Sequence, residues 1–226
     1  MENFDKAVSQ LDEKGKEKLV KAGNVFFNAI DKIVDKDIKE FTLNALSNAD
    51  YRFWIYPCSG SGKYHPPEDQ GIAGIIRHNI KMISVARGLL MPFNLENDYY
   101  KDLAISSCSL HDILKNGVPW KGSTDYKHGF LAYEWLKQFQ LGNGKEEIMN
   151  AVRYHMGKWC AVAEEHEKNA EKLNKEEIER ALNSTPFERI IQISDYIASR
   201  KEISFMPGLE VIFNEDFREK YGEINI

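Results

Sequence analysis

The sequence lacks three features that would place it in a class by themselves: paired cysteines, a long hydrophobic run and an excess of basic residues. Its cysteines, at positions 58, 108 and 160, are odd in number and form no CxxC pair, which argues against a disulfide framework or a thiolate zinc site. No apolar run reaches the length of a membrane span, and the N-terminus shows no signal-peptide pattern. We therefore expect a protein of the reducing cytoplasm, without a membrane segment.

The composition is that of an ordinary acidic protein. The 226 residues are 42% hydrophobic and 12% aromatic, which is enough for one full-sized core. Charged residues make up 29% of the chain and the net charge is -5, so no basic surplus suggests a protein that coats nucleic acid. An anionic substrate would have to be attracted by local groups. We expect a single domain over residues 1–226.

The apolar residues recur with the helical period in nearly every informative window, which predicts an all-α fold. Residues 1–56 read as a helical framework, and the Pro- and Gly-rich segment 57–71 reads as a loop. A helix is predicted over 95–117, with its end at Asn116-Gly117. Others are predicted to begin at His128 and at Pro186. The tail 201–226 is uncertain, with one possible strand at 209–213.

Six polar side chains lie on helix faces that the periodicity predicts to be buried. A single histidine there is more often a core residue, and the His111-Asp112 dipeptide alone is close to chance. Burying the whole set without partners would cost several kcal/mol for each group, so something must compensate it. A divalent metal does this, and we predict these ligands: His78, His111, Asp112, His128, His155 and Asp195.

Imidazoles and carboxylates suit Fe, Mn, Zn, Co or Mg rather than Cu(I). Six ligands are too many for one ion that must also hold water and substrate, so we predict two ions, each with two histidines and at least one bridging carboxylate. Two ions about 3.5–4 Å apart can hold a bridging hydroxide as nucleophile. Lys115 follows His111 by four residues, so its ammonium is predicted to lie one helical turn along and to contact phosphate.

These residues carry a resemblance to a known family. The order H…HD…H…H…D, with "HDILKNG" and "ISDYIASR", resembles the HD-domain superfamily of metal-dependent phosphohydrolases over residues 65–200. The lead-in "KYHPPEDQGIAGIIRH" is similar to the family's glycine-containing approach to its first metal histidine. The resemblance implies an all-α bundle that converges on a metal centre. It also implies hydrolysis of phosphate esters, commonly nucleotides or oligonucleotides.

The resemblance also implies a role for each ligand. His78 matches the first metal histidine, His111 and Asp112 the HD pair with Asp112 as the bridge, and Asp195 the final aspartate. His128 and His155 match the extra pair of the two-metal branch. No GYP extension follows the HD pair, so the cyclic-dinucleotide subgroup is not supported. The same ligand set resembles the di-iron oxygenase branch, which oxidises substrates with O2.

Several other residues are weaker candidates. His65 and Tyr64 lie in the Pro-rich loop and could contact substrate, while Arg77 and Arg153 lie near ligand positions and could bind phosphate. Asp125 could cap a helix or orient His128.

Three hypotheses remain open. The first is a two-metal phosphohydrolase or phosphodiesterase, with Asp112 and Lys115 as catalytic groups and a small phosphate ester, a nucleotide or a short oligonucleotide as substrate. The second is a di-iron oxygenase on the same scaffold. The third is a helical binding protein in which the polar cluster is a satisfied hydrogen-bond network.

Overall fold

The computed structural model of the chain describes residues 2–59, 65–157 and 175–201. Within these ranges the regular structure is ten α-helices and two short 3-10 helices, without a strand, which confirms the all-α prediction. None of these helices combines the length and the apolar character needed to cross a bilayer. The possible strand at 209–213 and Tyr64 lie outside the described residues.

The local sequence accounts for several helix starts. Asp12, Asp35 and Asn97 each accept a hydrogen bond from a backbone N–H in the first turn of the helix that follows. In chain order the elements are α1 (Glu2–Ser9), α2 (Glu13–Ile30), α3 (Lys36–Asn48), α4 (Tyr51–Ile55), η1 (Pro67–Gln70), α5 (Gly74–Leu89), η2 (Met91–Phe93), α6 (Asp98–Leu110), α7 (His128–Leu136), α8 (Lys145–Tyr154), α10 (Lys175–Leu182) and α11 (Pro186–Ala198).

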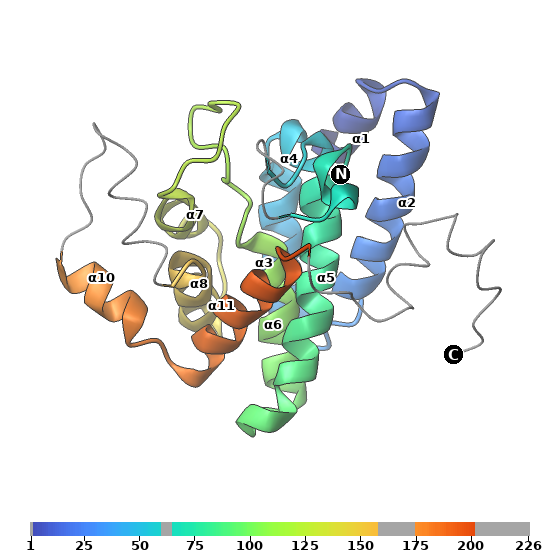
Figure 1. Ribbon diagram of the computed structural model, residues 1–226. Coiled ribbons are helices and arrows are strands. Elements are labelled where there is room, and N and C mark those ends of the chain that lie inside the picture. The colour runs from blue at the N-terminus through green and yellow to red at the C-terminus, as the bar shows by residue number, and fades with distance from the viewer. Residues whose placement is uncertain (1, 60–64, 158–174, 202–226) are drawn as a thin grey trace.

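Helices α5 and α6 form the centre of the bundle. They pack against each other, α5 also packs against α2 and α11, and α6 also packs against α3 and α8. Figure 1 shows α2 on one side of this central pair and α7, α8 and α10 on the other. The helices that carry the predicted ligands therefore gather around α5 and α6.

The N-terminal helices are held to this centre by aromatic packing. Trp54 is fully buried. Its ring lies 5.2 Å from Phe4, 6.1 Å from Phe26 and 5.1 Å from Phe53, measured between ring centroids. These edge-on contacts add to the burial of large apolar surface. Trp54 belongs to the same buried cluster as the core residues of α5 and α6.

The helix predicted to continue to Asn116-Gly117 ends earlier, at Leu110, so the prediction was wrong about its length. His111 caps α6, and residues 111–120 form a series of turns. A continuing helix would pair the Cys108 carbonyl with the Asp112 N–H. Here that carbonyl accepts a hydrogen bond from the ring Nδ1 of His111 at 2.9 Å instead. The His-Asp pair therefore lies at a helix end rather than inside a helix.

A buried carboxylate joins the N-terminal helices to α6, and its removal should destabilise the fold. Asp102 is 2% exposed and accepts hydrogen bonds from the backbone N–H groups of Val34 at 3.0 Å and Asp35 at 2.8 Å. We expect Asp102→Ala to lower the free energy of unfolding by about 2–3 kcal/mol, since it leaves both N–H groups unpaired. Urea denaturation measures this. In the control Asp98→Ala, an exposed carboxylate on the same helix, the loss should stay below about 0.5 kcal/mol; equal losses would contradict the prediction.

Candidate metal centre

The structure brings together all six residues that the sequence predicts as ligands. His78 comes from α5, His111 caps α6 with Asp112 directly after it, His128 begins α7, His155 caps α8 and Asp195 lies on α11. The four histidines and Asp112 are each at most 3% exposed. The side chain of Asp195 is 25% exposed, so it lies at the open edge of the cluster and is less buried than predicted.

Asp112 lies between two pairs of histidines. Its Oδ1 is 3.0 Å from the Nε2 of His128 and 3.9 Å from the Nε2 of His155. Its Oδ2 is 3.4 Å from the Nε2 of His111 and 2.5 Å from the Nζ of Lys115. Each oxygen of this carboxylate therefore faces a different part of the cluster, which is the arrangement of a bridging ligand.

Backbone carbonyls fix the orientation of three of the imidazoles. The Nδ1 atoms of His111, His128 and His155 lie 2.9, 2.6 and 2.7 Å from the carbonyls of Cys108, Asp125 and Val152, each three residues earlier. A carbonyl only accepts, so Nδ1 carries the proton and donates it. The neutral ring then presents an unprotonated Nε2 to the cluster, as a metal ligand does.

Helix ends supply two of these acceptors. The last four carbonyls of an α-helix have no partner inside the helix. His111 and His155 occupy the C-cap positions of α6 and α8, so their rings fold back onto free carbonyls of the last turn. The free carbonyls at the ends of these two helices thus orient two of the predicted ligands.

The arrangement of lone pairs tests whether a cation fits. The Nε2 atoms of His128 and His155 are only 2.9 Å apart, and Asp112 Oδ1 lies 3.0 Å from the first. In neutral rings with protons on both Nδ1 atoms, all three atoms can only accept. Three lone pairs that meet in a buried space repel one another, and a divalent cation turns this repulsion into attraction. The residues present therefore fit a metal ion.

A second group of ligands lies on the other side of Asp112. The Nε2 of His78 is 3.0 Å from Asp195 Oδ1, and the Nε2 of His111 lies 4.0 Å from the same oxygen. The His111 Nε2 is buried and has no hydrogen-bond partner. Ligand atoms of His78, His111 and Asp112 lie within 4.8 Å of one another, as do those of Asp112, His128 and His155. Each group contains two histidines and shares Asp112.

Burial and charge set the protonation of these groups. Burial lowers the pKa of His78 to about 4, although Asp195 opposes this, and burial lowers the pKa of His155 to about 3. Burial alone would raise the pKa of Asp112, but the charges of His111 and Lys115 hold it well below its ordinary value. Burial alone would lower the pKa of His111 as well, but the charge of Asp112 raises it above its ordinary value. Neutral imidazoles beside an ionised carboxylate are the forms that bind metal, so metal binding would displace the second ring proton of His111.

A glycine allows the close approach of α7 and α8. A Cβ on Gly129 would lie 2.7 Å from the Arg153 carbonyl oxygen and 3.3 Å from the Cε1 of His155. Any other residue after His128 would push the two helices, and with them the two histidines, apart.

A family model describes this combination of fold and ligands. The model of the HD domain matches residues 75–200, which is more than half of the chain. The chain belongs to the HD domain family. This family consists mostly of metal-dependent hydrolases, and membership implies binding of divalent metal. No curated protein and no solved structure matches the chain significantly.

We call the cluster of the six predicted ligands the HD centre. Lys115 contacts it, but from a different local structure than predicted. It lies in the turns after α6 rather than one turn along a helix. Its Nζ nevertheless contacts Asp112 Oδ2, and its side chain is 12% exposed. Burial alone would lower the pKa of Lys115, but Asp112 raises it above its ordinary value, so the ammonium stays charged.

The structure places the weaker substrate-contact candidates differently. The ring of His65 lies 5.3 Å from that of His78, between centroids, beside the HD centre. Arg77 donates to the carbonyl of Ile72 at 2.5 Å, and Arg153 pairs with Glu177. These two arginines thus bind partners outside the six-residue set, and a role for them in substrate binding stays a prediction.

Asp125 orients His128 through its backbone rather than through its carboxylate. Its carbonyl holds the Nδ1 of His128, while its side chain accepts from the Lys127 N–H at 2.9 Å and pairs with Lys121 at 2.6 Å. Sequence reasoning missed Cys58, whose Sγ lies 3.6 Å from the Nζ of Lys115. Its only signal was its place seven residues before His65.

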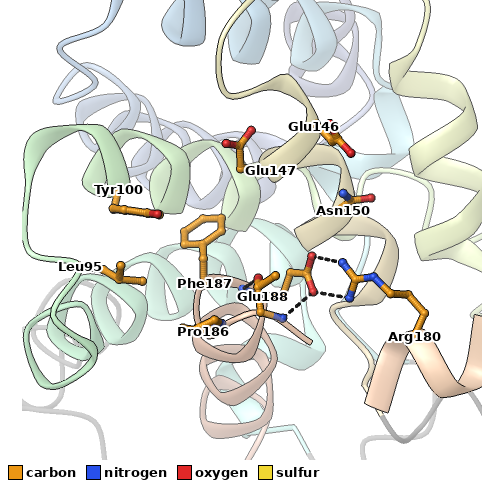
Figure 2. Close-up of a pocket in the computed structure, with 10 residues that line it drawn as sticks. Leu95, Tyr100, Glu146, Glu147, Asn150, Arg180, Pro186, Phe187 and Glu188 are labelled. Carbon is orange, nitrogen blue, oxygen red and sulfur yellow. Dashed lines mark hydrogen bonds and ion pairs between the residues drawn. The ribbon is translucent and has the colours of Figure 1, made fainter. Parts of the chain in front are cut away.

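A separate surface pocket of about 420 Å³ lies where α8, α10 and α11 meet the start of α6 (Figure 2). Figure 2 shows Glu146 and Glu147 on one wall, and Arg180 held by Glu188 through two contacts of 2.6 and 2.7 Å. This carboxylate-rich wall repels an anion, and the one arginine is already neutralised. The pocket is therefore a poorer phosphate site than the HD centre.

The position of Asp112 predicts the metal content of its variants. We expect Asp112→Ala to lose metal from both groups, because each group includes one Asp112 oxygen. Asp125→Asn should retain its metal, since the carbonyl that holds His128 remains. Elemental analysis of purified proteins measures the metal per chain. Full loading of Asp112→Ala would contradict the bridging position.

Proposed function

We propose that this HD protein is a metal-dependent phosphohydrolase or phosphodiesterase that acts on a nucleotide-like phosphate ester. The observation that carries the proposal is the position of Asp112, whose two oxygens face different histidine pairs. A carboxylate placed in this way suits two neighbouring divalent ions. The family, which consists mostly of metal-dependent hydrolases, supports the same reaction class.

The ligand groups divide naturally between two ions. One ion would be held by His78, His111 and Asp195. The other would be held by His128 and His155, and Asp112 would bind both ions. This donor set suits Fe, Mn, Zn, Co or Mg. When bound, such ions supply Lewis acidity toward the phosphoryl group and lower the pKa of water.

The chain itself contributes a rigid, preorganised site. Three imidazoles are fixed by backbone carbonyls, so their Nε2 atoms keep direction and protonation state without rearrangement. Groups that are already oriented need no reorganisation when charge develops in the transition state. The role of these carbonyls is therefore to hold the site in its reactive geometry.

Lys115 is the cation that we assign to the substrate. Its charged Nζ lies 2.5 Å from Asp112 Oδ2 and 3.6 Å from the Sγ of Cys58. In this position it would stabilise negative charge on a phosphoryl oxygen. A single buried ammonium suits the small charge of a phosphate monoester or diester, such as a nucleotide or a short oligonucleotide, rather than long nucleic acid.

Hydrolysis by the metal-loaded protein tests the proposal. We expect the Mn²⁺-loaded full chain to hydrolyse members of a panel of nitrophenyl phosphates, cyclic nucleotides and dinucleotides without O2. Lys115→Met should lower kcat/KM roughly 10²-fold while metal content is retained, since it removes one stabilising charge. The matched control is Lys121→Met, a lysine that pairs with Asp125 and is half-exposed, and it should keep wild-type activity.

Other outcomes would identify a different function. Product formation that requires O2 would replace the hydrolase with a di-iron oxygenase. No turnover of any ester by fully loaded protein would favour a binding protein.

A further inference from the structure

A third group of ligand atoms lies beside the HD centre. The Sγ of Cys58, a ring nitrogen of His65 and a ring nitrogen of His78 lie within 4.8 Å of one another. The Cys58 Sγ is 3.9 Å from the Nε2 of His65. In tetrahedral zinc sites, bonds of about 2.3 Å to sulfur and about 2.0–2.1 Å to nitrogen place these ligands roughly 3.5 Å apart. The observed distance between Cys58 Sγ and His65 Nε2 would therefore need to shorten only slightly.

The group of Cys58, His65 and His78 is largely buried and contains ring nitrogens without a hydrogen-bond partner. Cys58 is 1% exposed and His78 is fully buried, and the side chain of His65 is 13% exposed. The Nδ1 atoms of both histidines are buried and have no hydrogen-bond partner. A buried imidazole nitrogen without a partner is costly, and a metal ion bound to the Nδ1 of His78 offsets that cost. In His65 it is the Nε2 that faces Cys58, while the Nδ1 faces Asp69.

The loop that carries Cys58 and His65 is built against α5. A Cβ on Gly74 would lie 2.1 Å from the Asp69 carbonyl oxygen and 2.6 Å from the Cys58 nitrogen, so only glycine permits this approach. The Cys58 N–H donates to the Asp69 carbonyl at 2.8 Å, and the Asp69 carboxylate pairs with Lys81 at 2.5 Å. The backbone of Cys58 is thus held in place beside α5.

Asp69 also supplies an outer partner for His65. Its Oδ2 lies 3.9 Å from the Nδ1 of His65, on the opposite side of the ring from Cys58. A carboxylate behind a histidine is a common support for zinc, because it fixes the ring and leaves the other nitrogen free to bind.

We propose that Cys58, His65 and His78 form an accessory site for Zn²⁺, which shares His78 with the HD centre. The thiolate makes this site softer than the group of His78, His111 and Asp112, so it favours Zn²⁺ over Mn²⁺ or Mg²⁺. Zinc binding forms one Zn–S bond and two Zn–N bonds and releases the thiol proton to solvent, and the remaining ring proton of His78 leaves with it when the other nitrogen of that ring holds an ion of the HD centre. This site goes beyond the proposed hydrolysis and does not depend on it.

Co²⁺ serves as a probe, because a thiolate ligand gives Co²⁺ an intense near-ultraviolet charge-transfer band that imidazole and carboxylate ligands lack. We expect the full chain to show this band on titration with Co²⁺. Cys58→Ser should abolish it, and His65→Ala should raise the Co²⁺ concentration needed at least tenfold. Cys108→Ser, a change at the other buried cysteine of the described residues, should retain the band. His111→Ala should also retain it, although it weakens the HD centre.

Absence of the band in the wild-type chain would overturn the proposal, as would a band of equal intensity in Cys58→Ser. Should that variant fail to fold, X-ray absorption by the Zn²⁺-loaded wild-type chain identifies the atoms bound to zinc. One sulfur at about 2.3 Å supports the site, and a shell of nitrogen and oxygen alone contradicts it.

Discussion

The structure depends on one electrostatic constraint: nitrogen and oxygen lone pairs converge around Asp112 among buried side chains. The Nε2 atoms of His128 and His155 face each other at 2.9 Å, with Asp112 Oδ1 beside them. Neutral rings with protons on Nδ1 have no hydrogen to share there. A fold that buries such a cluster needs positive charge at its centre, and the HD family meets that need with divalent metal.

The helices around the cluster are arranged to satisfy this constraint. α6 and α8 end where their free carbonyls can accept hydrogen bonds from the Nδ1–H groups of His111 and His155. Gly129 allows α7 to approach α8 closely. Lys115 balances part of the negative charge of Asp112. The backbone thus fixes the direction of each ligand, while the side chains provide the chemistry.

Much of this could be predicted from the sequence. The helical period predicts the all-α fold, and polar residues on apolar faces identify the six clustered residues. Three features could not be predicted. The early end of α6 results from competition between His111 and the backbone for the Cys108 carbonyl, which periodicity does not reveal. The pairing of His78 with Asp195 joins residues 117 positions apart. The place of Cys58 depends on the close approach of its backbone to Gly74.

The most direct test of the account is an anomalous diffraction measurement on crystals of the full chain grown with Mn²⁺. We expect two anomalous peaks about 3.5–4 Å apart, each within bonding distance of a different oxygen of Asp112. One peak should lie beside His78 and His111, the other beside His128 and His155. A single peak, or peaks that do not contact Asp112, would contradict the claim that this carboxylate bridges two metal ions.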